Sequence, residues 1–233
     1  MDRTWDAFYH GDLQGLWSLI VVPALFLLAR PWRRPRRAGA DPRAAGFVCA
    51  WATVFTFATI ADPPAIVRLG LPVLPFVLLG DFRVFLLVLG VAEPDRPLSG
   101  AIARAAAWTM VVPVIAWTSY HLAIAIAGPL PEQVLWLAYE IAFVALALWW
   151  RARRIPDRRP IALRYLRAVL AYVALYYALW GVADVLILAG VDLGWALRVI
   201  PNQLYYSFWM PFAWGLFFSR RYASTRSPVQ ARR

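Results

Sequence analysis

Long apolar runs separated by short polar connections occupy most of this 233-residue chain. A helix rises 1.5 Å per residue, so crossing a hydrocarbon core of about 30 Å takes roughly 17 to 25 residues. Seven runs approach or reach this length: Gln14–Ala29, Ala44–Ala61, Leu69–Val91, Ala103–Ala127, Val134–Trp150, Leu166–Ala189 and Leu193–Ser219. The runs are continuous rather than alternating, and a backbone in lipid must satisfy its hydrogen bonds within each segment. The pattern therefore predicts an all-α membrane protein, a bundle of seven transmembrane helices.

Composition supports a membrane protein. Hydrophobic residues make up 62% of the chain and 13 residues are Trp, more than a soluble domain of this length carries. The first apolar run follows an acidic opening (Asp2, Asp6 and Asp12) without a basic segment or a cleavage signature. We therefore expect the first span to be retained rather than removed as a signal peptide.

Arginine placement gives the spans a direction. All 24 basic residues are Arg, and twenty of them lie in segments expected on one side of the membrane, at residues 30–43, 96–104, 151–167 and 220–233. Segments on the other side hold two. The positive-inside rule then places the N-terminus outside and the C-terminus in the cytoplasm. Since the Arg runs flank apolar spans, they indicate topology and headgroup contact rather than a nucleic-acid partner, despite a net charge of +11.

The connections are too short to fold alone. We therefore predict one transmembrane domain over residues 1–221, with a disordered basic cytoplasmic tail over residues 222–233. The expected localisation is the cell inner membrane, and the expected partners are membrane lipids and a small-molecule or ion substrate. The sequence does not indicate an oligomeric state.

Missing residue types exclude several chemistries. The chain has no Lys, which removes any Schiff base, including one to retinal. Cys49 is the only cysteine, so an internal disulfide and a cysteine metal cluster are excluded. With His10 and His121 as the only histidines, the sequence predicts no metal site and no cofactor.

Two charges interrupt the third run, in the stretch "LLGDFRVFLL" at residues 78–87. Asp81 lies near the predicted midplane, as does Glu140 in the fifth run, and Arg83 lies slightly to the cytoplasmic side. Residues two positions apart on a helix differ by about 200°, so Asp81 and Arg83 are expected to find partners on other helices. Arg83 could instead extend to cytoplasmic headgroups, whereas Asp81 is expected to meet a cation or stay protonated. Gly80 would permit the close approach of a neighbouring helix.

Further polar residues lie in the outer halves of the predicted spans. Ionisable groups inside a membrane usually face the bundle interior and mark functional sites. These residues are Asp62, His121, Asp184, Arg198 and Asn202. Arg198, Asn202 and Tyr205 follow one another at helical spacing beside Pro201, which predicts one polar stripe on a kinked helix. We expect the acidic groups to meet in a common polar cavity, although core packing would also explain the single aromatic and histidine residues.

The number and direction of the spans resemble those of opsins, but no Lys is present to hold retinal. They also resemble those of small sugar transporters built from two three-helix repeats around a linker helix. Such repeats would align "IAD" at Ile60–Asp62 with "VAD" at Val182–Asp184. The paired prolines of that family have no counterpart in the second, fifth and sixth runs, so the resemblance is one of topology.

Three functions fit these observations. The first is a small-solute or ion transporter that uses the intramembrane carboxylates and Arg198. The second is an intramembrane enzyme acting on a lipid or isoprenoid, with Asp81 and Glu140 as the acid–base pair. The third is a receptor or tether that holds a cytoplasmic partner through the Arg-rich connections. Of these, the sequence favours the transporter.

Overall fold

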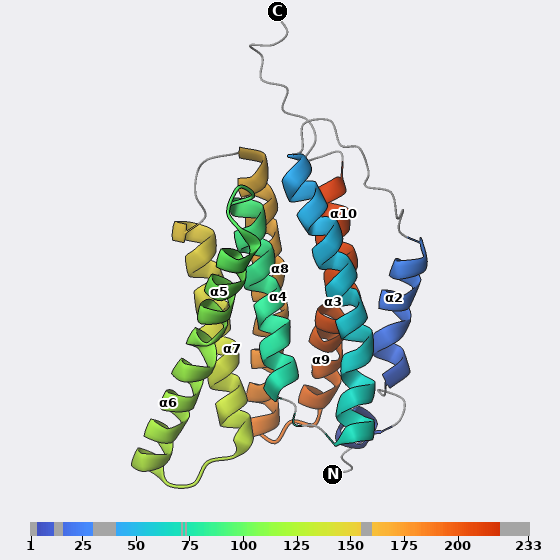
Figure 1. Cartoon of the computed structure of the whole chain (residues 1–233). Helices are drawn as coiled ribbons and strands as arrows, with labels where there is room; N and C mark the ends of the chain where they lie inside the picture. Colours follow the sequence, from blue (N-terminus) through green and yellow to red (C-terminus); the bar gives the residue numbers. More distant parts are fainter. Residues whose placement is uncertain are drawn as a thin grey trace, which may run out of the picture.

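The computed structural model describes residues 4–11, 16–29, 41–70, 72, 74–154 and 160–219, with the backbone alone described at 16–17, 63–69, 154 and 160–161. Every regular element among these residues is a helix (Figure 1). In chain order they are α1 (Thr4–Tyr9), α2 (Leu16–Ala29), α3 (Pro42–Leu69), α4 (Leu74–Ala92), α5 (Leu98–Thr109), α6 (Val111–Ala127), α7 (Glu132–Trp149), the π-helix η2 (Trp150–Arg154), α8 (Pro160–Leu188), α9 (Leu193–Asn202), the π-helix η3 (Gln203–Phe208) and α10 (Trp209–Phe218).

Five helices are long and apolar enough to cross a membrane: Pro42–Asp62, Leu74–Ala92, Leu98–Ala127, Glu132–Arg153 and Ala162–Leu188. The prediction of an all-α chain is confirmed for the described residues, and these five helices are compatible with the predicted multi-pass membrane protein. The first and last predicted spans are not among the five. Helix α2 has 14 residues, about 21 Å at 1.5 Å per residue, and the last apolar run is divided among α9, η3 and α10.

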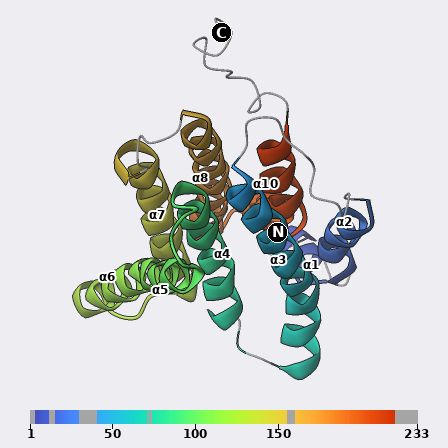
Figure 2. The same ribbon diagram turned by 45° about the horizontal axis from the view of Figure 1, so that its top comes forward.

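The long helices run side by side, with α1 at one end of the bundle and the last residues of α10 at the other (Figure 1). Helix α2 lies outside α3, while α5 packs on α4 and α6 packs on α7 (Figure 2). Helices α5 and α6 meet at Met110. Pro113 follows three residues later and has no N–H for the helical hydrogen bond, which favours a break there.

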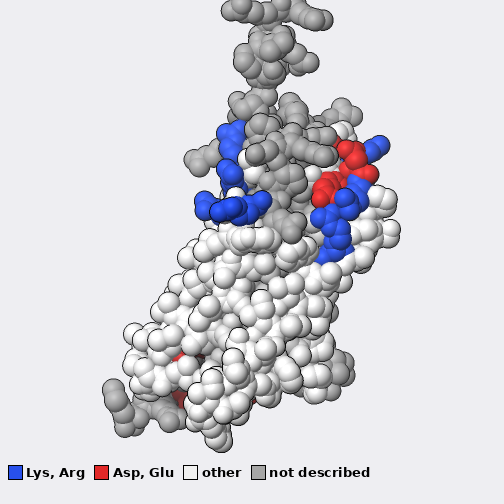
Figure 3. Space-filling model, turned by 90° about the vertical axis from the view of Figure 1, so that its left-hand side faces the viewer, with Lys and Arg blue, Asp and Glu red and all other residues white. Residues whose placement is uncertain are grey.

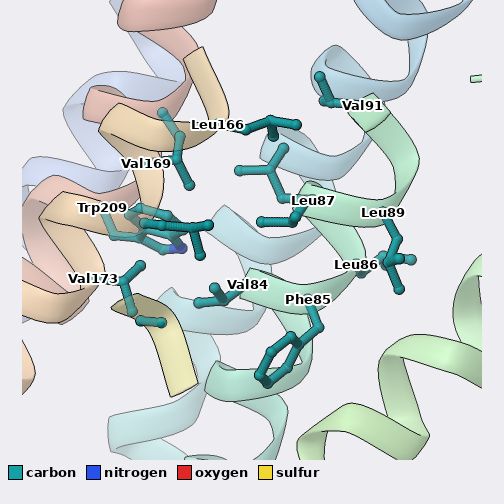
Figure 4. Packing of buried hydrophobic residues seen from close by; sticks show 14 of the residues in the cluster. Val84, Phe85, Leu86, Leu87, Leu89, Val91, Leu166, Val169, Val173 and Trp209 are labelled. Carbon is teal, nitrogen blue, oxygen red and sulfur yellow. The ribbon is translucent and has the colours of Figure 1, made fainter. Parts of the chain in front are cut away.

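Helix α4 occupies the centre of the bundle. From Gly80 to Val91 every residue except Phe82 is buried. Its apolar side chains Val84 and Leu87 face Val169 and Val173 of α8 (Figure 4). Because α4 is surrounded on all sides, polar residues on it are forced into the interior of the molecule.

Two helices extend further than the apolar runs predicted. Helix α3 continues through Pro63 and Pro64 to Leu69, beyond the predicted end of the run at Ala61, and ends at Gly70 in the left-handed region (φ 61°). Proline has a fixed φ close to the helical value, so the helix can continue. The missing N–H groups nevertheless leave the carbonyls of Thr59 and Ile60 without their helical donors.

Helix α8 begins at Pro160, six residues before the predicted start at Leu166. Tyr165 and Leu166 are buried, and the Tyr165 hydroxyl donates to the Ala213 carbonyl of α10 at 3.1 Å. Arg164 and Arg167 lie on the exposed side of the same turn. This segment was expected to be a basic loop because of its arginines, but its apolar residues form a packing face.

Arg side chains gather toward one end of the face shown in Figure 3, beside acidic ones, and no Arg is visible over the rest of that face. Several of them form ion pairs near the end of α4, including Arg43 with Asp95 at 2.7 Å and Arg104 with Glu93 at 2.6 Å. The predicted tail at residues 222–233 lies outside the described residues.

Candidate functional site

Asp81 is fully buried on α4 and accepts hydrogen bonds from two tyrosines. The Tyr139 hydroxyl of α7 donates to Oδ2, and the Tyr177 hydroxyl of α8 donates to Oδ1. The Tyr177 ring is in turn stacked on Phe143, with the ring centroids 4.1 Å apart. Asp81 was expected to meet a cation or stay protonated, and in the described part of the chain no Arg forms an ion pair with it. Two neutral donors satisfy the carboxyl group instead.

Arg83 is also buried, and its guanidinium bonds to two other helices. Nη1 donates to the Thr59 hydroxyl of α3 at 2.8 Å, and Nη2 donates to the Tyr205 carbonyl of η3 at 2.9 Å. Its Cζ also lies 4.3 Å from the centre of the Tyr205 ring, a cation–π contact. The alternative in which Arg83 extends to the headgroups is therefore wrong, because the side chain is held within the bundle.

Gly80 allows the η3 segment to approach α4 closely. A Cβ atom at this position would lie 1.4 Å from the Tyr205 hydroxyl and 2.5 Å from its ring. The close approach expected from the sequence therefore involves an aromatic side chain. We refer to Asp81, Arg83, Thr59, Tyr139, Tyr177 and Tyr205 together as the α4 centre.

The last apolar run changes its helical geometry just before it reaches the α4 centre. Pro201 lies near the end of α9, and residues 203–208 form the π-helix η3. A π-helix has wider turns with bonds from residue i to i+5, and such segments are often found at functional sites. The predicted stripe is divided here: Tyr205 joins the α4 centre, while Arg198 and Asn202 join a second group of residues.

This second group comprises Glu140 of α7, Asp184 of α8 and Arg198 of α9, which we call the α7–α8–α9 cluster. Arg198 Nη1 lies 3.3 Å from Asp184 Oδ1. Glu140 interacts electrostatically with both of the others. Both carboxylic residues are buried, yet Glu140 Oε2 and both oxygens of Asp184 have no hydrogen-bond partner among the described residues.

Helix α1 closes one side of the α7–α8–α9 cluster. The Trp180 indole N–H donates to Asn202 Oδ1 at 2.9 Å, and the Asn202 amide donates to the Tyr9 hydroxyl at 3.1 Å. Arg198 Cζ lies 5.8 Å from the centre of the Tyr9 ring. Asp192 holds α1 in this position, since its carboxylate accepts hydrogen bonds from two backbone N–H groups at the start of α1.

The remaining predicted site residues lie apart from these contacts. Asp62 is buried on α3, close enough to Arg83 for their charges to interact. His121 is exposed on α6, where its ring contacts Trp117 at 4.1 Å between centroids. No described contact joins His121 to either group. The carboxyl groups expected in one cavity are therefore divided, with Asp81 in the α4 centre and Glu140 and Asp184 in the α7–α8–α9 cluster.

The described residues contain no group of three or more His, Cys, Asp or Glu that could hold a metal ion. The polar side chains of the α4 centre and the α7–α8–α9 cluster can form hydrogen bonds, carry charge and exchange protons. Sequence reasoning did not select Tyr139 or Tyr9 as site residues. A tyrosine in the middle of an apolar span, such as Tyr139 beside Glu140, is a signal that could have pointed to one of them.

Comparison of the chain with family models, with curated proteins and with solved structures finds no match.

Proposed function

We propose that the chain crosses the inner membrane seven times, with its N-terminus outside and its C-terminus in the cytoplasm. The five long helices supply five passes. Helix α2 and the broken α9–η3–α10 segment would supply the first and the last. The gathering of arginines at one end of the bundle supports this direction, because basic residues remain on the cytoplasmic side.

Within this topology we infer a transporter for a small solute or ion, with the α4 centre as its coupling site. One observation supports this inference above all. Asp81 and Arg83 are buried charged residues on the central helix, and together they form hydrogen bonds with four other elements: α3, α7, α8 and η3. A change in charge or occupancy at this position would act on all four. Transporters commonly place such sites beside an interrupted helix near the bilayer midplane, and η3 interrupts the last apolar run.

Protonation of Asp81 supplies a coupling step. Both oxygens of Asp81 accept hydrogen bonds, from Tyr139 and Tyr177, an arrangement that suits an ionised carboxylate. A protonated carboxyl group has one O–H donor, so one of the two oxygens then donates a hydrogen bond. At least one tyrosine must change its hydrogen bonding, which links the proton on Asp81 to the position of α7 or α8.

Transport by protein reconstituted in lipid vesicles tests this proposal. With an imposed pH gradient, we expect the wild type to move protons or a member of a broad solute panel, and we expect Asp81→Asn to lose this activity while still eluting as a folded protein. Asp95→Asn is the matched control, since Asp95 is exposed at the end of the bundle. Wild-type vesicles that match empty vesicles for every solute would contradict the proposal, as would an Asp81→Asn variant with full activity.

The α7–α8–α9 cluster favours a second candidate, the intramembrane enzyme acting on a lipid or isoprenoid. Its predicted acid–base pair, Asp81 and Glu140, lies in two different groups. Glu140 and Asp184 are a better pair, since both are buried, interact electrostatically and have oxygens without hydrogen-bond partners. Comparing the membrane lipids of cells with and without the protein tests this candidate, and identical lipid profiles would remove its support.

A further inference from the structure

A groove of about 580 Å³ runs between α7 and α8 on the outside of the bundle. Its walls include Leu137, Ile141, Val144 and Leu148 of α7, with Val182 and Val185 of α8. Ile141 is 60% exposed and Val182 is 53% exposed, so the groove opens outward. In a membrane-spanning bundle this opening faces the hydrocarbon of the bilayer.

Glu140 differs from the rest of this apolar lining. It lines the groove, yet the residue is only 4% exposed and Oε2 has no hydrogen-bond partner among the described residues. Gly181 lies opposite, and even a Cβ atom there would be 3.7 Å from Oε2. Glu140 therefore places a buried hydrogen-bond acceptor just behind the surface of an otherwise apolar groove.

The charges around Glu140 do not balance. Glu140 and Asp184 are two acidic groups, and Arg198 is the cation that interacts with them. The ion pair of Arg198 is with Asp184, at 3.3 Å. When both carboxyl groups are ionised, the negative charge of Glu140, which lines the groove, has no ion-pair partner among the described residues.

We propose that this groove binds a long-chain amphiphile with a protonated amine head group, whose ammonium meets Glu140 and whose hydrocarbon chain lies between α7 and α8. An ammonium supplies the missing positive charge and donates the hydrogen bond that Oε2 lacks. From Glu140 to Leu148 the groove offers about 12 Å of apolar wall for the chain, at 1.5 Å per residue. An ordinary phospholipid chain would fill the space but leave Glu140 unpaired.

This site is separate from the transport function inferred for the α4 centre. It depends on Glu140 and the apolar lining of α7 and α8, it opens to lipid, and Tyr177 is the lining residue that also belongs to the α4 centre. Failure of the transport assay would leave this inference intact, and failure of amine binding would leave the transport inference intact.

Photo-crosslinking tests the site with the full chain in nanodiscs of a zwitterionic phospholipid. The probe is a long-chain primary alkylamine with a diazirine in the chain, compared with the alcohol and the carboxylic acid of the same length. We expect saturable labelling of α7 and α8 by the amine, with weaker labelling by the alcohol and the least by the acid. Glu140→Gln should weaken amine binding about tenfold, the size expected for a lost charge-assisted hydrogen bond.

Two matched controls accompany these measurements. Glu132→Gln, at the exposed start of α7, should bind the amine like the wild type. Ala178→Trp should block the groove, whereas Ala125→Trp, exposed on α6 and outside the lining, should not. This pair tests the site even if Glu140→Gln fails to fold. Labelling that is equal for all three head groups, or unchanged in Ala178→Trp, would indicate ordinary contact with bilayer lipid and overturn the proposal.

Discussion

The α4 centre and the α7–α8–α9 cluster both place charged side chains inside an apolar bundle, but they satisfy those side chains differently. In the α4 centre, both oxygens of Asp81 and both terminal nitrogens of Arg83 have hydrogen-bond partners, and Arg83 Nε has none among the described residues. In the α7–α8–α9 cluster, three carboxylate oxygens have none among the described residues. The first group thus stabilises contacts between helices, and the second retains capacity to bind.

Their surroundings explain this difference. Helix α4 is covered by its neighbours from Gly80 to Val91, so nothing outside the chain can reach Asp81 without a rearrangement. Glu140 lies beside an open groove, where a ligand could satisfy it. Removing a side chain from the α4 centre should therefore cost stability, whereas removing the Glu140 charge should chiefly affect binding.

Arg83→Met should have the largest effect. The substitution removes both guanidinium hydrogen bonds and the positive charge near Asp81 and Asp62. Breaking a buried charged network costs about 3 to 5 kcal/mol, so we expect a loss of that order in the free energy of unfolding, measured by denaturant titration in mixed micelles.

Arg83→Lys separates the contribution of charge from that of geometry. Lysine keeps the charge, but its single ammonium cannot reproduce the planar fork that reaches the Thr59 hydroxyl and the Tyr205 carbonyl together. An intermediate stability is expected. If Arg83→Met unfolded at the wild-type denaturant concentration, the α4 centre would not be a stabilising network.

Gly80→Ala should have the next largest effect. The new methyl group would overlap the Tyr205 hydroxyl, so Tyr205 or α4 must shift. Overpacking of this kind costs about 1 to 3 kcal/mol. Gly215→Ala on α10 is the control, because a Cβ there meets nothing within 4 Å. Adding Tyr205→Phe to Gly80→Ala should restore part of the loss, and a lack of any recovery would locate the strain elsewhere.

Tyr139→Phe and Tyr177→Phe should each cost about 1 kcal/mol, a typical value for one hydrogen bond. Each leaves Asp81 with one donor, and the double variant leaves it with neither. We expect the double variant to lose more than the sum of the single losses, in the same unfolding titration. Additive losses would mean that the two tyrosines do not share the carboxyl group.

The α4 centre also marks how far the sequence could predict the structure. The spacing of Asp81 and Arg83 excluded a direct pair, and Gly80 correctly indicated close packing. The partners could not be predicted, because they depend on how each helix is rotated about its axis. Tyr139 and Glu140 are consecutive and differ by about 100°, which places one in the α4 centre and the other in the α7–α8–α9 cluster.

Other residues required knowledge of tertiary contacts. Tyr9 reaches Asn202 only because Asp192 holds α1 against the bundle. The start of α8 was placed too late because its arginines suggested a loop, whereas the apolar residues between them pack on α10. Apolar length predicted five of the spans, but it could not show that the last run changes to a π-helix.

Glu140→Gln should have the smallest effect on stability, and it is the sharpest contrast with Tyr177→Phe. A glutamine keeps the size of the side chain, removes one of two neighbouring acidic groups, and breaks no hydrogen bond described for Oε2. We therefore expect the free energy of unfolding to change by less than about 0.5 kcal/mol. Asp184→Asn is the comparison within the cluster, since it weakens the ion pair with Arg198 and should cost more. A large loss of stability in Glu140→Gln would mean that the Glu140 carboxylate already supports the fold. The α4 centre and the α7–α8–α9 cluster would then not differ in the way proposed, with one holding helices together and the other open to a ligand.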